Sequence, residues 1–253
     1  MMLSTSPLLR GVRHGFSTRR GGVSTGRFAT LNLGGKWGDD PEAVAHNRRR
    51  FAAAGGFDWE RLFTAKQVHG ARVAVVVEGT LPERVAVSEA DVVVTAQPGA
   101  VVGVYTADCV PILFADGDGR VAAAHAGWRG TVQGVAVAAV EALVSIGAHR
   151  ESLHAALGPS ICARCFEVGD EVAAAFDALV PSAVVRARGQ KPHVDLWEAN
   201  RRLLVDAGVR AEAIDAKPPC TMCEAERYFS FRRDGSGIGQ QLSFVASTAL
   251  VDG

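Results

Sequence analysis

The stretch VVGVYTADCVPILFADGDGRVAAAHAG (101–127) decides the fold. It contains three short runs rich in valine, leucine and alanine, at 101–107, 111–116 and 121–127. Continuous apolar runs of this length are typical of strands in a sheet that is covered on both faces. The stretch therefore predicts core strands of an α/β protein.

Asp108 and Cys109 interrupt these apolar runs just before Pro111. Because adjacent residues of an extended strand point to opposite faces, both side chains enter one pocket only where the strand ends or bulges. Pro111 favours such an end. Ligand sites of α/β folds usually form where strands meet loops. We expect Asp108 to act there either as a catalytic base or substrate hydrogen-bonder, or as a residue that orients its neighbours.

The pattern of alternating strands and helices continues on both sides of this stretch. Asp40, Pro41 and Glu42 predict the start of a helix, and Gly55-Gly56 its end. Other elements are predicted as strands at 73–79, 90–96, 153–159, 229–235 and 241–247, and as helices at 131–146, 170–179 and 195–207. Without a repeat or linker, residues 1–253 are predicted to form a single α/β domain (an α+β sandwich) with a central mixed sheet flanked by helices.

Composition excludes several classes of protein. The 253 residues are 48% hydrophobic and 21% charged, and Lys+Arg and Asp+Glu both number 27, so no basic field favours nucleic acid. No stretch approaches the roughly 18 apolar residues that span a bilayer. The apolar segment at the N-terminus is too short for the core of a signal peptide. Together with the five cysteines, an odd number, these features predict a reduced, cytoplasmic protein. They make no prediction of its oligomeric state.

Three residues of metal-ligand type follow or interrupt the predicted strands. They are His69 in KQVHG, Cys109 in TADCVP and His125 in AAAHAGWRG. Two imidazoles and one thiolate suit Zn²⁺ and leave a fourth position for water or substrate, which is typical of catalytic zinc. The alternative is that each histidine is an ordinary polar residue and Cys109 a small buried hydrophobe.

The residues after His125 predict an anion site. Gly127 to Thr131 form a turn that leads directly into a helix, where backbone amides and Arg129 would attract phosphate. A tight turn with Trp128 packed in the core is the other interpretation.

Ten segments, in order and across nearly the whole chain, resemble the YfiH-like laccase-domain family, whose members are also described as polyphenol oxidases and purine nucleoside phosphorylases. They are HGFSTRRGGVS, LNLG, the Asn47-Arg48 pair, KQVHG, TADCVPILF, AHAGWRG, GPSIC with FEVG, DLWEAN, CTMC and FSFRRDG. The resemblance implies a fold likened to the catalytic domain of cytotoxic necrotising factor. It also implies that His69, Cys109 and His125 hold a metal.

The activities assigned to this family are phosphorolysis of adenosine, inosine and methylthioadenosine, deamination of adenosine, copper-dependent phenol oxidation and editing of peptidoglycan precursors. The resemblance therefore implies a zinc-dependent purine nucleoside phosphorylase that uses phosphate, with adenosine deaminase activity as a second reaction. The matched motifs supply Asn47, Arg48 and Gln67, with Arg129, as the expected substrate-binding residues.

Two rival activities use the same residues. Multicopper oxidases build their copper cluster largely from His-x-His pairs, and none of the seven histidines forms such a pair, so Cu²⁺ in the Cys/His₂ set would oxidise phenols only weakly. A cysteine hydrolase, with Cys109 as nucleophile and His125 as its base, needs no metal. His69 discriminates, because a metal site requires it and a Cys-His dyad does not.

Two C-x-x-C pairs, Cys162/Cys165 and Cys220/Cys223, stand apart from these residues. Such pairs usually indicate structural zinc, but 55 positions separate Cys165 from Cys220, far more than the roughly 15–20 typical of zinc ribbons. The sequence leaves open whether these pairs bind anything.

Overall fold

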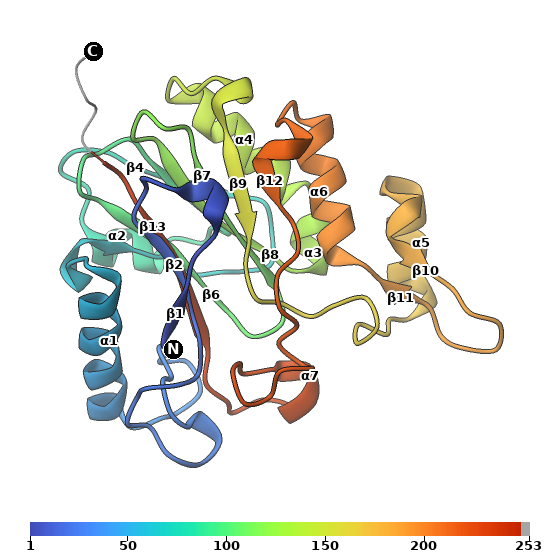
Figure 1. Cartoon of the computed structure of the whole chain (residues 1–253), viewed down its shortest axis with the longest axis horizontal. Helices are drawn as coiled ribbons and strands as arrows, with labels where there is room; N and C mark the ends of the chain where they lie inside the picture. The colour runs from blue at the N-terminus through green and yellow to red at the C-terminus, as the bar shows by residue number, and fades with distance from the viewer. Residues whose placement is uncertain (249–253) are drawn as a thin grey trace.

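A computed structural model describes residues 1–248 (Figure 1), so the predicted end of the domain at residue 253 lies outside the described residues. Two mixed β-sheets and, within this range, seven α-helices form a mixed α/β fold, as the sequence predicts. The strands divide between two packed sheets, however, and do not form one central sheet. A small two-stranded ribbon, β10 (Val184–Val185) and β11 (His193–Val194), stands apart from both.

The first sheet has six strands and contains the quoted stretch. Its order is β12 (Ile214–Asp215), β9 (His154–Leu157), β7 (Val110–Ala115), β8 (Val121–Ala126), β5 (Val92–Thr95) and β4 (Val73–Val76). The outer pairs β12–β9 and β4–β5 are parallel, and the inner pairs are antiparallel.

The second sheet has five strands and packs against the first. Its order is β1 (Leu3–Ser4), β2 (His14–Ser17), β13 (Gln241–Ala246), β6 (Val101–Thr106) and β3 (Leu62–Phe63). Only β3–β6 is parallel. Strands β6 and β7 are consecutive in the chain but belong to different sheets, so the chain crosses from one sheet to the other at Asp108 and Cys109.

Apolar side chains on both faces of the six-stranded sheet are buried. Along β7, Leu113 and Ala115 face the five-stranded sheet, whereas Ile112 and Phe114 face the helices. Complete burial of an aliphatic or phenyl side chain stabilises the fold by about 1.5–3 kcal/mol. This two-sided burial explains why the strands are apolar without alternation.

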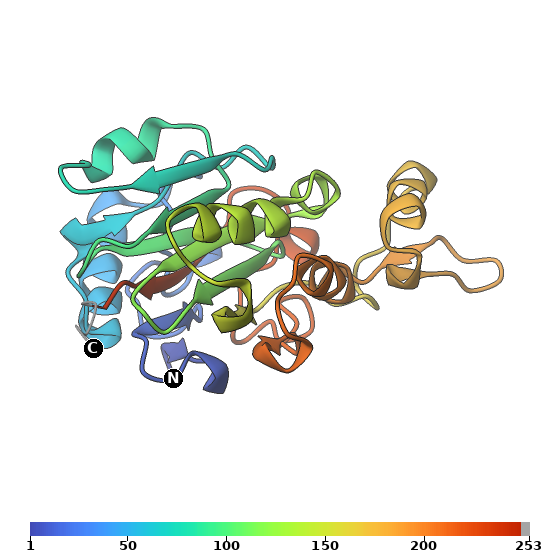
Figure 2. The ribbon, with the colours of Figure 1, turned by 90° about the horizontal axis from the view of Figure 1, so that it is seen from above.

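Seven helices, within residues 1–248, lie around the two sheets, and some of them cover the outer faces. They are α1 (Pro41–Gly55), α2 (Pro82–Val87), α3 (Trp128–Val132), α4 (Val135–Ser145), α5 (Asp170–Leu179), α6 (Leu196–Asp206) and α7 (Phe231–Asp234). Helices α4 and α6 pack on the six-stranded sheet, and α1 packs through Phe51 on the other. Figure 2 shows that α5 and the β10–β11 ribbon extend from one end of the molecule.

Helix α1 confirms the predicted capping. The Asp40 side chain accepts a hydrogen bond from the backbone N–H of Glu42, and Gly56 ends the helix in the left-handed conformation at φ 66°. Helix α6 begins in the same way, with Asp195 accepting from two backbone amides.

Two predicted elements differ from the structure. The helix predicted over 131–146 is divided into α3 and α4, because Gly134 adopts φ 80°, which interrupts the helical backbone. The strand predicted over 229–235 is the short helix α7, whose first turn is capped by the Ser230 hydroxyl accepting from the backbone N–H of Arg233. Among residues 1–248, no helix combines the length and the apolar character needed to cross a membrane.

Candidate functional site

The three predicted metal ligands converge in the structure. The ligand atoms of His69, Cys109 and His125 all lie within 4.8 Å of one another. His125 belongs to β8, Cys109 lies in the crossover between β6 and β7, and His69 lies in the loop between β3 and β4. The two imidazole rings meet edge to face with centroids 4.8 Å apart. The donor set fits one metal ion and leaves room for a further ligand.

Gly127 makes this convergence possible. A Cβ atom at this position would lie 2.9 Å from the Cys109 Sγ and 3.1 Å from a carbon of the His69 ring. Both distances are too short for a side chain, so only glycine lets the thiolate and the imidazole approach β8 this closely.

Asp91, directly before β5, organises the site and is not among the residues that line the cavity over it. It is buried, and its carboxylate accepts a hydrogen bond from His125 Nδ1 at 2.8 Å and from the backbone amides of Val68, His69 and Gly70. A carboxylate on one ring nitrogen directs the other nitrogen toward the metal. The sequence analysis did not identify Asp91, although an acid in the valine-rich run ADVVVTA was a visible signal.

The charges of the site depend on this arrangement. Burial alone would raise the pKa of Cys109, but the neighbouring imidazoles of His125 and His69 outweigh it and lower the pKa to about 6. Burial would lower the pKa of His125, but the Cys109 thiolate and Asp91 raise it to about 9. In the metal-free protein at neutral pH, Cys109 and His125 therefore form a thiolate–imidazolium pair.

Asp108 adopts a left-handed backbone conformation, at φ 95°. Its carboxylate accepts hydrogen bonds from the Thr221 hydroxyl and the Arg232 backbone amide, both at 2.6 Å, and its carbonyl accepts from Ile161 N–H. Neighbouring side chains of a regular strand point to opposite faces, and the unusual backbone angle of Asp108 sets the directions of these two side chains. The Asp108 carboxylate binds the surrounding loops, whereas the Cys109 thiol faces the histidines.

A cavity of about 900 Å³ opens over the three ligands. Aromatic residues contribute much of its wall, and they are Trp37, Tyr105, Trp128, Phe166 and Phe231. The rings of Trp37 and Phe231 lie 6.0 Å apart. Ligand pockets are usually about 300–1,000 Å³ and mostly apolar, so the cavity has the size and character of a small-molecule site.

Two of the four predicted substrate-binding residues line this cavity. Arg129 is exposed there, and its guanidinium lies 4.3 Å from the Trp128 ring centre. Gln67 also lines the cavity, but its side-chain amide is already paired with the backbone of Tyr105, donating at 2.7 Å and accepting at 2.8 Å.

The other two predicted residues lie behind the wall of the cavity. Asn47 is fully buried, and its amide donates to Ser24 and to the carbonyls of Thr30 and Asn32. Arg48 donates to the carbonyl of Leu33. Both residues hold the loop before α1, and neither is among those that line the cavity.

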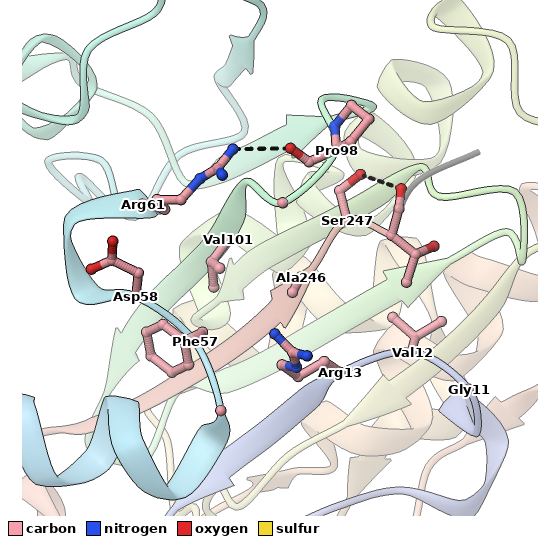
Figure 3. Close-up of a pocket in the computed structure, with 13 residues that line it drawn as sticks. Gly11, Val12, Arg13, Phe57, Asp58, Arg61, Pro98, Val101, Ala246 and Ser247 are labelled. Atoms are coloured by element: carbon pink, nitrogen blue, oxygen red, sulfur yellow. Dashed lines mark hydrogen bonds between the residues drawn. The ribbon is translucent and has the colours of Figure 1, made fainter. Parts of the chain in front are cut away.

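A second cavity, of about 1030 Å³, lies at the opposite ends of β6 and β13 (Figure 3). Arg13, Asp58 and Arg61 line it, and Arg61 donates to the carbonyl of Pro98 at 3.0 Å. None of the three metal ligands reaches this cavity. The chemistry therefore belongs to the first cavity.

Comparison with known proteins identifies the family. The model of a family described as "Multi-copper polyphenol oxidoreductase laccase" matches residues 13–248. The chain belongs to this laccase family. The resemblance inferred from the sequence motifs is thereby confirmed.

Relatives in the laccase family carry names of nucleoside enzymes. The chain is 42% identical over 245 residues to a "Purine nucleoside phosphorylase" of Deinococcus radiodurans, covering 94% of this chain and 92% of that protein. It is 44% identical over 243 residues to "Adenosine deaminase RL5" of an unknown prokaryotic organism, covering 91% and 92%. The crystal structure of Bacillus licheniformis hypothetical protein YfiH superposes with a TM-score of 0.89 at 31% identity, covering 95% and 94%.

The donor set of this laccase-family chain differs from that of a multicopper centre. Only two groups of three or more convergent His, Cys, Asp or Glu side chains occur in residues 1–248, and one of them contains cysteines alone. The other supplies two imidazoles and a thiolate, and the chain has no His-x-His pair. These residues fit a mononuclear site and not a copper cluster.

Proposed function

We propose that this protein is a zinc-dependent enzyme of purine nucleosides, primarily a phosphorylase of adenosine, inosine and S-methyl-5′-thioadenosine. The observation that carries the proposal is the position of the Cys/His₂ donor set at the base of an aromatic cavity. The names of the relatives, a purine nucleoside phosphorylase and an adenosine deaminase, support purine nucleosides as the substrate class.

The aromatic wall suits a purine base. Trp37 and Phe231 offer ring faces, and Phe231 is 48% exposed although it is apolar. An exposed aromatic side chain that lines a cavity gains burial when a flat base stacks on it. We therefore place the purine on this side of the cavity.

Phosphate is the second expected substrate. Within residues 1–248, the side chains of Lys36 and Arg129 line the cavity and make no hydrogen bond or ion pair with the protein. Two unpaired cations provide the charge that a phosphate dianion requires. In phosphorolysis a phosphate oxygen bonds to ribose C1′ while the C1′–N9 bond breaks and the purine leaves with the bonding electrons.

His69, Cys109 and His125 would hold the zinc ion. When bound, zinc supplies Lewis acidity that polarises an oxygen of a substrate or of water. Asp91 fixes the orientation of His125, and Asp108 holds the loops on either side of Cys109. We therefore assign Asp108 a positioning role, because its carboxylate oxygens already have partners.

The test is a base-release assay. Purified protein with adenosine or inosine and phosphate is expected to release free base, and Cys109→Ala and His69→Ala are each expected to abolish release and remove the metal. His46→Ala changes an exposed histidine of α1 and is the matched control, which is expected to retain both base release and the metal. Full activity in metal-free His69→Ala protein would overturn the proposal.

Adenosine deamination is a second reaction of the same cavity. It needs water in place of phosphate, with attack at purine C6 and loss of ammonia. The relative named adenosine deaminase supports it. Ammonia release from adenosine without phosphate identifies deamination, whereas base release that requires phosphate identifies phosphorolysis.

A cysteine hydrolase is the second candidate function, and the Cys109–His125–Asp91 arrangement favours it. A thiolate of low pKa, an imidazole and an orienting carboxylate form a nucleophilic triad without a metal. An amide substrate such as a peptidoglycan precursor fits this chemistry. Two results together would favour this function: alkylation of Cys109 abolishes activity, and the His69→Ala variant remains active.

A further inference from the structure

We propose a second metal site in this protein, a structural zinc ion held by Cys162, Cys165, Cys220 and Cys223. The four Sγ atoms all lie within 4.8 Å of one another, and those of Cys165 and Cys223 are 3.4 Å apart. In tetrahedral zinc–thiolate sites the sulfurs are about 3.8 Å apart, as Zn–S bonds of about 2.3 Å require. The cage has the size of a Cys₄ zinc site.

The two C-x-x-C pairs are far apart in the sequence but close together in the fold. Strands β9 and β12 are parallel neighbours, and each precedes one pair. The backbone continues this pairing as a parallel bridge between Ser160 and Cys220, with Ser160 N–H donating to Pro219 and Thr221 N–H to Ser160. The 54 residues between Cys165 and Cys220 include α5, the β10–β11 ribbon, α6 and β12, and they do not separate the pairs in space.

Each C-x-x-C pair forms a compact turn. Cys165 N–H donates to the carbonyl of Cys162, and Glu224 N–H donates to that of Cys220, both at 3.0 Å. Cys162 N–H points at the Cys220 sulfur, 3.3 Å away. Backbone N–H groups directed at sulfur stabilise thiolates, which are the form that binds metal.

The exposure of the cysteines argues against two simpler roles. Cys223 is exposed and Cys165 half-buried, so the four residues are not merely small core hydrophobes. All four are free thiols, and a disulfide among them would require an oxidant. Four sulfurs around one point, with no carboxylate or imidazole, favour zinc among the divalent metals.

The proposed zinc would hold one wall of the substrate cavity. The loop with Cys162 and Cys165 also contains Ile161 and Phe166, which line the cavity. Thr221, between the other two cysteines, donates to Asp108, next to Cys109. The site shares no ligand with the His69, Cys109 and His125 set, so it stabilises the cavity without entering it.

Metal analysis tests this proposal independently of catalysis. Protein purified under reducing conditions is expected to contain about two zinc ions per chain. The double variant Cys165→Ser/Cys223→Ser is expected to contain about one, because it loses the four-cysteine site. His69→Ala is the matched variant, since it removes the other ion. Combining the three changes is expected to leave essentially no zinc.

Cobalt substitution identifies the ligands. In the His69→Ala background, Co²⁺ is expected to give the strong sulfur-to-metal charge-transfer absorption of a tetrahedral four-thiolate site, and this absorption is absent from the variant that also lacks Cys165 and Cys223. One zinc per wild-type chain that is lost in His69→Ala, iron in place of zinc at the four cysteines, or an intact mass two hydrogens lower from a disulfide would each overturn the proposal. None of these results depends on whether nucleosides are substrates.

Discussion

At the scale of single residues, the Asp91 carboxylate orients two of the three candidate ligands. One carboxylate fixes the His125 ring and, through three backbone amides, the loop that carries His69. Two of the three ligands therefore depend on one side chain. Burial alone would raise the pKa of Asp91, but the hydrogen bonds from His125 and the backbone amides outweigh it and lower the pKa below its ordinary value.

Asp91→Asn is expected to weaken zinc binding about 10–100-fold, because an amide does not enforce the same orientation of His125. The measurement is a competition titration of metal-free protein with a chelator of known affinity. Asp116→Asn is the control, since Asp116 is also buried but binds Arg120 in a turn at the far end of β7. Equal zinc affinity in Asp91→Asn and wild type would contradict the assigned role.

The convergence of His69, Cys109 and His125 was predicted from their residue types and, more strongly, from the resemblance of the motifs that carry them to the laccase-domain family. Asp91 was not predicted, because an acid before VVVT is equally typical of an ordinary strand start, and only tertiary pairing brings it to His125. Asn47 and Arg48 belong to the matched motifs, but their contacts with the loop before α1 depend on packing that no local pattern encodes.

At the scale of elements, β2 begins with a buried histidine that links it to the preceding chain. His14 accepts a hydrogen bond from Ser6 N–H through Nε2 at 2.9 Å, and its Nδ1 donates to the carbonyl of Val12 at 2.8 Å. The bond from Ser6 N–H needs the neutral ring, because a protonated Nε2 cannot accept, whereas Nδ1–H donates to Val12 in either state. Burial lowers the pKa of His14 below its ordinary value, and the two backbone contacts only partly oppose this.

The neutral His14 therefore stabilises the protein in a defined pH range. Its contribution is complete above the unfolded pKa of about 6.5 and is lost as the pH falls through the lower folded pKa. Urea unfolding is expected to show a larger loss of stability between about pH 7 and pH 5 in wild type than in His14→Gln, whose side chain does not titrate. His149→Gln, at an exposed position, is expected to behave as wild type. Parallel curves for wild type and His14→Gln would refute the assignment.

Many helices and strands follow from local sequence signals, and two of the exceptions have identifiable causes. The helix after His125 is interrupted because Gly134 adopts a conformation that periodicity does not reveal. The segment FSFRRDG alternates as a strand does, but the Ser230 cap and the contact between the Arg232 amide and Asp108 bend it into α7.

At the scale of the whole molecule, one apolar cluster joins the two sheets. Leu113 and Ala123 of the first sheet pack with Val102, Val104 and Val245 of the second. A shared core predicts that the sheets unfold together as one domain.

Leu113→Ala is expected to destabilise the protein by about 2–5 kcal/mol, because it leaves a cavity between the sheets. For each protein, fluorescence and far-ultraviolet circular dichroism are expected to report one and the same urea midpoint, which is lower in the variant than in wild type. Val87→Ala, at a position that is 75% exposed, is expected to change stability by less than about 0.5 kcal/mol. Two separate midpoints would show that the sheets belong to independent domains.

The exposure of His69 has a consequence for metal exchange. His125 is buried and Cys109 half-buried, whereas the His69 imidazole is open to solvent. If these three residues hold a metal ion, a chelator or a competing ion would meet His69 first, and exchange would begin at this one ligand. The supply of zinc or copper would then decide which ion the site holds. One cavity would then express nucleoside chemistry or weak phenol oxidation according to the ion it acquires.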